Sequence, residues 1–232
     1  MSADRGSEPR LVVFDFDGTL YRGDSGVELV LWLLRRQPLR AFAALLAAPL
    51  LAPLFQRMRW RRVVVSGFLW IANVGVSDRE GEQRLARYVQ DNAAALRARL
   101  LDAGLACLHG HRQAGDRVVI ATGAPPELVA QILALIAHEP VPVVGTVLGR
   151  RAGGLVAVRH CHGEEKLRML REAGFEAPVA VAYSDSTADL PLLLSAQQPV
   201  VVNAGVKTQA AFARALGARM HTLRWVGARE RT

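Results

Sequence analysis

The sequence predicts an α/β fold in which a parallel sheet is flanked by helices and a helical cap is inserted after the first strand. Short runs rich in Val, Ile and Ala alternate with helical segments, as in chains that form parallel sheets with crossover helices. Three of these runs end in a polar residue, at Asp15, Thr122 and Asp185. Ligands of parallel sheets bind beyond the carboxyl ends of the strands, so these residues are expected to meet at one site. With 232 residues, 51% of them hydrophobic, the chain is long enough for one main domain with a substantial insertion.

The first strand is expected at residues 11–14, where β-branched and aromatic residues form a continuous apolar run. Two acids, Asp15 and Asp17, follow it, and Gly18 then allows the backbone to turn sharply. Buried strands rarely end in unpaired acids. Because residues two apart on an extended segment face the same side, the two carboxylates are expected to converge on one cation or one reacting group.

The insert is expected to form a helical cap domain over residues 24–102, with a core domain made of residues 1–23 and 103–232. A helix over 24–36, an apolar block over 39–76 and a surface helix over 77–101 should build it. The chain has a net charge of +8, and residues 29–77 contribute most of it because they contain no Asp or Glu. The arginines of this segment are Arg35, Arg36, Arg40, Arg57, Arg59, Arg61 and Arg62.

The rest of the core is expected to alternate strands with helices. Apolar runs bounded by Gly, Pro, Ser or Asp predict strands at 117–121, 179–183 and 199–202. Helical spacing predicts a short helix ending at residue 114 and helices at 126–137, 164–173, 189–195 and 209–216. Residues 141–148 and 155–159 are expected to pair as a hairpin across the glycine-containing segment 149–154.

Composition excludes several classes of protein. The two cysteines, Cys107 and Cys161, provide neither a disulfide framework nor a Cys-x-x-Cys metal site. The polar N-terminal ten residues show no secretory signal, so a cytoplasmic location is expected. Nucleic acid is not expected as a partner, since the basic residues interleave with aliphatic ones and not with a set of stacking aromatics.

Four motifs occur in a fixed order along the chain. They are Asp15-Phe16-Asp17-Gly18-Thr19, Val119-Ile120-Ala121-Thr122-Gly123, Gly163-Glu164-Glu165-Lys166 and Tyr183-Ser184-Asp185-Ser186-Thr187-Ala188-Asp189. In this order they resemble the motifs of the haloacid dehalogenase superfamily phosphatases, and the resemblance covers essentially the whole chain. The insert after the first motif and the form of the fourth are similar to subfamily IB, which includes the phosphoserine phosphatases. The resemblance implies a Rossmann-like core.

The resemblance also implies a reaction, Mg²⁺-dependent hydrolysis of a phosphomonoester through an aspartyl-phosphate. It makes Asp15 the nucleophile and Asp17 the general acid and base. It places Mg²⁺ on Asp15, on the backbone carbonyl of Asp17 and on Asp185, and a hard cation of this kind prefers such oxygen ligands. The need for a cation is physical, because a carboxylate and a phosphate monoester repel each other unless positive charge lies between them.

The remaining motif residues are expected to hold the substrate. Thr122 and the amide of Gly123 should hydrogen-bond the phosphoryl group, and Lys166 should balance its charge. Gly18 and Asp24 complete the expected substrate contacts. Asp189 is expected either to orient Lys166 or to cap the following helix, and both roles are compatible. The histidines His109, His111, His160 and His162 receive no role.

The insert indicates which phosphomonoester is used. Together with Thr122-Gly123-Ala124-Pro125, its segment 33–39 is similar to the phosphatidylglycerophosphatase C enzymes, which remove the terminal phosphate of a phospholipid precursor. Its apolar stretches, 41–55 and 63–76, fall short of the ~20 residues that span a bilayer. A hairpin at an anionic membrane surface, with Trp60 and Trp70 at the boundary, is therefore expected at the inner face of the membrane.

Other interpretations remain open. The insert could be an ordinary cap core with solvated arginines. The enzyme could be a soluble small-metabolite phosphatase of the phosphoserine phosphatase type, although Ser184-Asp185-Ser186 replaces the Gly-Asp-Gly usual in those enzymes. A non-catalytic scaffold, a dehalogenase and a phosphomutase are the remaining alternatives, and the second acid, Asp17, favours a phosphatase over a dehalogenase.

Overall fold

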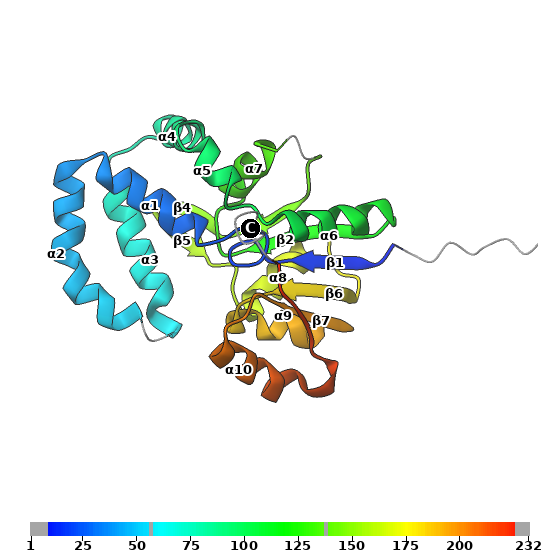
Figure 1. Ribbon diagram of the computed structural model, residues 1–232. Helices are drawn as coiled ribbons and strands as arrows, with labels where there is room; N and C mark the ends of the chain where they lie inside the picture. The colour runs from blue at the N-terminus through cyan, green and yellow to red at the C-terminus, as the bar shows by residue number, and fades with distance from the viewer. Residues whose placement is uncertain (1–8, 56–57, 137–138, 226–232) are drawn as a thin grey trace, which may run out of the picture.

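The centre of the fold is a six-stranded parallel sheet, seen in a computed structural model that describes residues 9–55, 58–136 and 139–225 and their side chains outside 50–62. In spatial order the strands are β3 (Val143–Gly145), β2 (Arg117–Thr122), β1 (Leu11–Phe14), β6 (Val179–Ser184), β7 (Gln198–Val202) and β8 (His221–Leu223). This confirms the predicted α/β class, and Figure 1 shows the sheet flanked by helices with the cap to one side.

Strand order reverses at β1, which lies between β2 and β6. Phe14, its last residue, pairs with Ile120 on one side and with Tyr183 on the other. A reversal of this kind opens a crevice beyond the carboxyl ends of the strands. The three strands therefore end at neighbouring points: Asp15 directly follows β1, Asp185 directly follows β6, and Thr122 is the last residue of β2.

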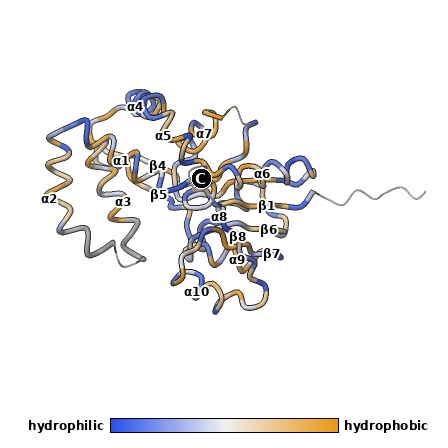
Figure 2. Tube along the Cα trace, viewed as in Figure 1, coloured by the Kyte–Doolittle hydropathy of each residue, from blue (hydrophilic) through white to orange (hydrophobic). Residues whose placement is uncertain are grey.

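Both faces of the sheet are covered. Val12 and Phe14 pack into one apolar cluster with α6 (Asp102–Gln113) and α7 (Pro126–Ala134), while Leu11 and Val13 pack into another. The second cluster is completed by α8 (Glu164–Glu172), α9 (Leu190–Ser195) and α10 (Val206–Leu216). Burial on two faces explains why the strand sequences are continuously apolar instead of alternating, and Figure 2 shows hydrophobic residues along the sheet.

The cap consists of α1 (Ser25–Arg35), α2 (Pro38–Phe55), α3 (Met58–Asn73), α4 (Asp78–Asp91) and α5 (Ala93–Arg97). Asp24 caps α1, accepting a hydrogen bond of 2.9 Å from the amide of Val27. Arg40 on α2 donates to the carbonyl oxygens of Ala72 and Val74 at the end of α3, which joins the two helices. The two residues lie at and just beyond the C-terminal end of α3, where backbone carbonyls need partners from outside the helix, and the guanidinium provides one.

Two predicted elements differ from the structure. The helix expected over 77–101 is broken at Asn92, whose side chain donates to the carbonyl of Tyr88 and competes with the helical pattern. The segment expected as one strand over 141–148 splits into β3 in the sheet and β4 (Val147–Arg151), which pairs antiparallel with β5 (Gly154–Arg159). The hairpin turn is Ala152-Gly153, both with positive φ, and not the six-residue segment expected.

The β4–β5 hairpin packs against α3 of the cap. The indole Nε1 of Trp70 donates to the carbonyl of Arg151 at 3.0 Å, and a Cβ on Gly154 would lie 2.4 Å from the same indole. A glycine is therefore needed where the ring crosses the strand. The hairpin belongs by sequence to the predicted core domain, and the division at 23/24 and 102/103 stays a prediction.

Candidate active site

The loop after β1 is a tight turn that presents its acids at the edge of the sheet. The amides of Thr19, Leu20 and Tyr21 all donate to the carbonyl of Phe16, which closes the turn. Gly18 has φ +79°, a left-handed conformation that residues with a Cβ rarely adopt. A Cβ at Gly18 would lie 2.0 Å from Oδ2 of Asp185, so the loop and the fourth motif are in contact at this point.

Replacing Gly18 by alanine is therefore expected to disrupt the site without unfolding the core. Gly18→Ala must displace the Asp185 carboxylate and strain the turn, and we expect kcat to fall by about 10²-fold or more, since displacements near 1 Å have such effects. Steady-state kinetics with a generic phosphomonoester measures this. Gly110→Ala is the matched control, because no atom lies within 4 Å of a Cβ at that position. Equal activity of the two variants would contradict the expectation.

Lys166 joins the first motif to the fourth. Its side chain has 0% exposure, and its Nζ lies 3.0 Å from Oδ1 of Asp15 and 2.7 Å from Oδ2 of Asp189. Burial disfavours the ammonium ion, but the two carboxylates outweigh this effect and raise the pKa of Lys166. The lysine is therefore held as a cation beside the expected nucleophile.

Asp189 is the second carboxylate in contact with this lysine. Its Oδ2 also accepts a hydrogen bond of 2.8 Å from the hydroxyl of Ser184, which in turn accepts from the amide of Ser186. Although Asp189 stands at the N-cap position of α9, its side chain forms no capping hydrogen bond. Of the two expected roles, the geometry shows the contact with Lys166.

Asp17 faces the cap, not Lys166. Its Oδ1 accepts a hydrogen bond of 2.8 Å from the amide of Ser25 in the first turn of α1. Burial raises the pKa of Asp17 to about 7, although this hydrogen bond opposes the rise. At neutral pH the group can therefore both give and take a proton, as a general acid and base must.

Asp185 approaches from β6 and is held by the first loop. Its amide donates to the hydroxyl of Thr19 at 3.2 Å, and burial, followed by the charge of Asp189, raises the pKa of Asp185 to about 6. Burial likewise raises the pKa of Asp15, which the charge of Lys166 opposes. The site thus contains more buried carboxylates than cations.

These acids fit a hard divalent cation. The expected ligands, the carboxylates of Asp15 and Asp185 and the backbone carbonyl of Asp17, are all oxygens, the donor set that Mg²⁺ prefers. No cluster of three or more His, Cys, Asp or Glu side chains that could hold a metal ion was found within the part of the chain that the structure describes. The expected set contains two such side chains and one main-chain oxygen, and the excess of buried negative charge would be relieved by a cation.

The second motif lies beside the acids. The hydroxyl oxygen of Thr122 accepts a hydrogen bond of 3.0 Å from the amide of Ala124, which shapes the loop after β2. Thr122 is fully buried, whereas Gly123 lines the cavity in front of the acids. A Cβ at Gly123 would lie 3.0 Å from Nε2 of His162, so the imidazole packs closely against this glycine. The contacts of both motif residues with a phosphoryl group stay predictions.

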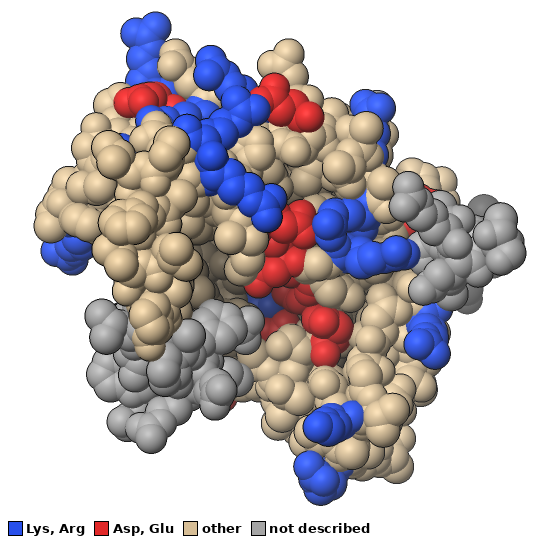
Figure 3. Space-filling model, turned by 60° about the vertical axis from the view of Figure 1, so that its left-hand side comes forward, with Lys and Arg blue, Asp and Glu red and all other residues tan. Residues whose placement is uncertain are grey.

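The acids form one end of a cavity of about 680 Å³ between the core and the cap. Asp15, Asp17 and Asp185 line that end, with Gly18 and Asp24 nearby. The opposite wall is apolar and comes from α1, α2, α3 and the hairpin, with Val30, Leu34, Leu45, Phe68, Leu69 and Leu148 among its residues. In Figure 3 acidic side chains gather in the hollow beside the largely uncharged surface of the cap.

Several residues of this site had no assigned role in the sequence. His160 and His162 line the cavity, and their rings lie 4.5 Å apart between centroids. The signal for this role in the sequence was their position, since His160 lies four residues and His162 two residues before Glu164 of the third motif. Leu148 and Ala157 reach the cavity through the hairpin, whose packing against α3 has no local sequence signal.

The chain is similar in sequence and in fold to several known proteins. The family model for haloacid dehalogenase-like hydrolases matches residues 12–194. Protein CicA of Caulobacter vibrioides is 31% identical over 205 residues, covering 85% of this chain and 88% of CicA. A protein of unknown function from Bordetella pertussis Tohama I shares the fold, with a TM-score of 0.70 and 21% identity over 93% of this chain and 99% of that one. A substrate-bound phosphoserine phosphatase aligns with a TM-score of 0.57 and 13% identity over 97% of each chain.

Proposed function

The chain belongs to the haloacid dehalogenase-like hydrolases, and from this premise we propose that it is a Mg²⁺-dependent phosphatase acting on a lipid phosphate such as phosphatidylglycerophosphate. The observation that carries the choice of substrate is the cavity, because it joins the catalytic acids directly to a large apolar wall. In a phosphomonoester with a hydrocarbon tail, the phosphate can lie at the acids while the tail packs against the apolar wall.

The chain's own residues account for the transfer of the phosphoryl group. A carboxylate oxygen of Asp15 bonds to phosphorus while the bond to the leaving oxygen breaks, and Asp17 gives that oxygen its proton. Asp17 then takes a proton from water as the water oxygen displaces the phosphate from Asp15. Lys166 holds Asp15 in place and balances negative charge throughout. A Mg²⁺ ion held by Asp15, Asp185 and the carbonyl of Asp17 would supply further positive charge against the phosphate oxygens.

The apolar wall favours a tailed substrate over a charged metabolite. A serine phosphate would need partners for its ammonium and carboxylate groups, because leaving such groups unpaired in a buried site is costly. Asp24 is one such partner at the cavity and is the feature that favours the alternative, a soluble phosphatase of the phosphoserine phosphatase type. Arg35 also lines the cavity and could pair with a carboxylate, but most of the remaining wall is aliphatic.

The surface of the cap supports a role at an anionic membrane face on the cytoplasmic side. On α2, Leu39 is 86% exposed, Leu45 70% and Leu46 60%, and Phe42 is exposed as well. Apolar residues of this size contribute to interfacial binding when they enter the headgroup region. Within the described ranges no helix is long and apolar enough to cross a bilayer. The expected contacts of Trp60 and of the arginines at 57–62 lie outside the described side chains.

A substrate series with Mg²⁺ tests the proposal. Alkyl phosphates of increasing length should bind more tightly, with KM falling by up to about fourfold per added methylene until the cavity is filled, because each buried methylene contributes about 0.8 kcal/mol. Phosphatidylglycerophosphate in mixed micelles and phosphoserine are compared in the same assay. A kcat/KM for phosphoserine above that of every alkyl phosphate would favour the soluble-metabolite alternative.

A pair of neighbouring leucines provides the matched control for that series. Leu45 lines the cavity, whereas Leu46 does not. We expect Leu45→Gln to raise KM for long alkyl phosphates by about tenfold and to leave that for the shortest one unchanged, with Leu46→Gln behaving as wild type. Both side chains are largely exposed, so neither change should unfold the cap.

A further inference from the structure

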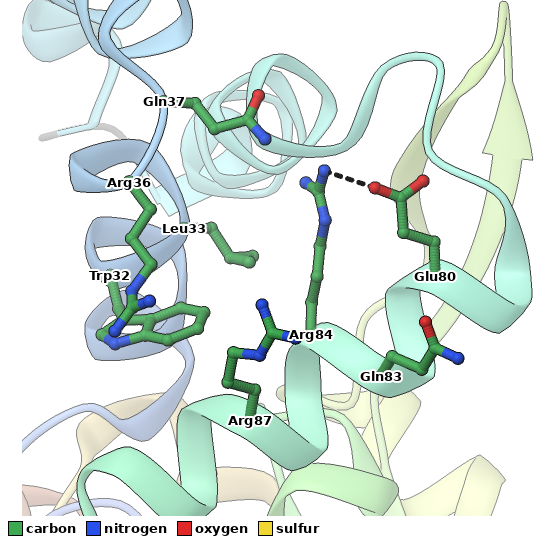
Figure 4. Close-up of a pocket in the computed structure, with 8 residues that line it drawn as sticks. All are labelled: Trp32, Leu33, Arg36, Gln37, Glu80, Gln83, Arg84 and Arg87. Carbon is green, nitrogen blue, oxygen red and sulfur yellow. Dashed lines mark hydrogen bonds and ion pairs between the residues drawn. The ribbon is translucent and has the colours of Figure 1, made fainter.

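A second pocket lies on the cap, away from the catalytic acids, between the end of α1 and the middle of α4. It has a cavity volume of about 480 Å³ and is lined by Trp32, Arg36, Gln37, Glu80, Arg84 and Arg87, among others. Figure 4 shows side chains from both helices directed into the space between them. The pocket shares no lining residue with the cavity of the active site.

The three arginines of this pocket exceed the carboxylates that neutralise them. Arg36 pairs with Asp91 at 2.7 Å and lies over the ring of Trp32 at 4.4 Å, while Arg84 pairs with Glu80 at 2.7 Å. Arg87 forms no ion pair with any carboxylate that the structure describes. The pocket therefore carries a net positive charge.

A fourth arginine, Arg40 of α2, does not line the pocket but adds positive charge to this part of the cap. Arg40 is tied to the carbonyl oxygens of Ala72 and Val74, and burial followed by the charge of Arg84 lowers the pKa of Arg40. The charge of Arg84 therefore acts unfavourably on that of Arg40. A bound anion would offset the unfavourable interaction between these positive charges.

We propose that this pocket binds a phosphate-bearing anion. Guanidinium groups present paired N–H donors whose spacing matches two phosphate oxygens, so Arg84 and Arg87 can each bind in a bidentate way. The amides of Gln37 and Gln83 can donate further hydrogen bonds to the remaining oxygens. The phosphate group that these donors would bind occurs both in phospholipid headgroups and in soluble phosphate compounds.

The surroundings favour a headgroup. The exposed residues Leu39 and Phe42 of α2 follow Gln37 closely along the chain, so apolar side chains lie next to the charged pocket in sequence. Anionic lipid surfaces are bound by such a combination of basic and apolar groups. This site neither takes part in the proposed reaction nor depends on it.

Vesicle flotation with the full chain tests the site. Wild-type protein should bind vesicles of phosphatidylglycerol and phosphatidylcholine, and Arg84→Gln/Arg87→Gln should bind about 30-fold more weakly, about fivefold for each charge removed. Arg79→Gln is the matched control for Arg87→Gln alone, because each removes one charge from the same helix and Arg79 is exposed and outside the pocket. Arg87→Gln alone breaks no ion pair and should lower binding about fivefold, whereas Arg79→Gln should lower it clearly less.

Inorganic phosphate distinguishes the two sources of the anion. If phosphate raises the melting temperature of the wild type but not of the double variant, while vesicle binding is the same for both, the ligand is a soluble phosphate. If the double variant matches Arg79→Gln in both assays, the proposal is overturned. Activity on a short, soluble phosphomonoester should be unchanged in the double variant. If the wild-type protein shows no phosphatase activity but still binds vesicles, the proposed function is refuted and the proposed anion site is not.

Discussion

Asp15→Asn is expected to abolish turnover of every phosphomonoester, lowering kcat by about 10³-fold or more. An amide nitrogen or oxygen in this position cannot form the covalent phosphate, and removal of a nucleophile usually has an effect of this size or larger. The fold should survive, since asparagine has nearly the same shape and the change removes a charge that burial disfavours. Lys166 keeps its second partner, Asp189, in this variant.

Covalent trapping separates a chemical effect from a structural one. Wild-type protein quenched in acid during turnover should carry one phosphoryl group on the peptide that contains Asp15, and the variant should carry none. The thermal midpoint of Asp15→Asn should equal or exceed that of the wild type. A variant that keeps wild-type kcat would refute the proposed mechanism, whatever the substrate.

The sequence alone predicted the part of the site that follows strands. Asp15, Thr122 and Asp185 each stand directly after a short apolar run, and parallel strands bring their carboxyl ends to one edge. The prediction needs only a local pattern, an apolar run followed by a polar residue, and the rule that parallel strands end at the same edge of the sheet. The contact of Lys166 with Asp15 spans 151 positions of sequence, and without the family resemblance the lysine would have been one solvated helical residue among others.

Features that depend on packing between distant segments were not predictable in this way. The hairpin of β4 and β5 lies against α3 because Trp70 crosses Gly154, a fit of shape that leaves no periodic signal. Strand β8 has three exposed residues and no apolar run to mark it. The arginine pocket arises only when α4 lies beside the end of α1, so the sequence placed the charge of the insert at 29–77 and missed Arg84 and Arg87.

Lys166→Met is expected to have the largest effect on stability and also a large effect on activity. The methionine fills a similar volume, but Asp15 and Asp189 are then buried without their shared cation. Breaking a buried ion pair from one side costs about 3–5 kcal/mol, because the remaining charge is left uncompensated. We expect a loss of this size in urea denaturation with chelator present, and a fall in kcat of about 10²–10³-fold at saturating Mg²⁺.

A second substitution shows whether charge is the cause. Lys166→Met/Asp189→Asn removes one of the two stranded carboxylates, and it should recover part of the lost stability, about 1–3 kcal/mol, through the coupling that contacting charges show in double-mutant cycles. It should recover no activity, because the nucleophile still lacks its cation. If instead the double variant is less stable than Lys166→Met, the lysine acts through packing, and the view of Asp189 as the group that positions it fails. The two readouts thus separate what Lys166 does for the fold from what it does for Asp15.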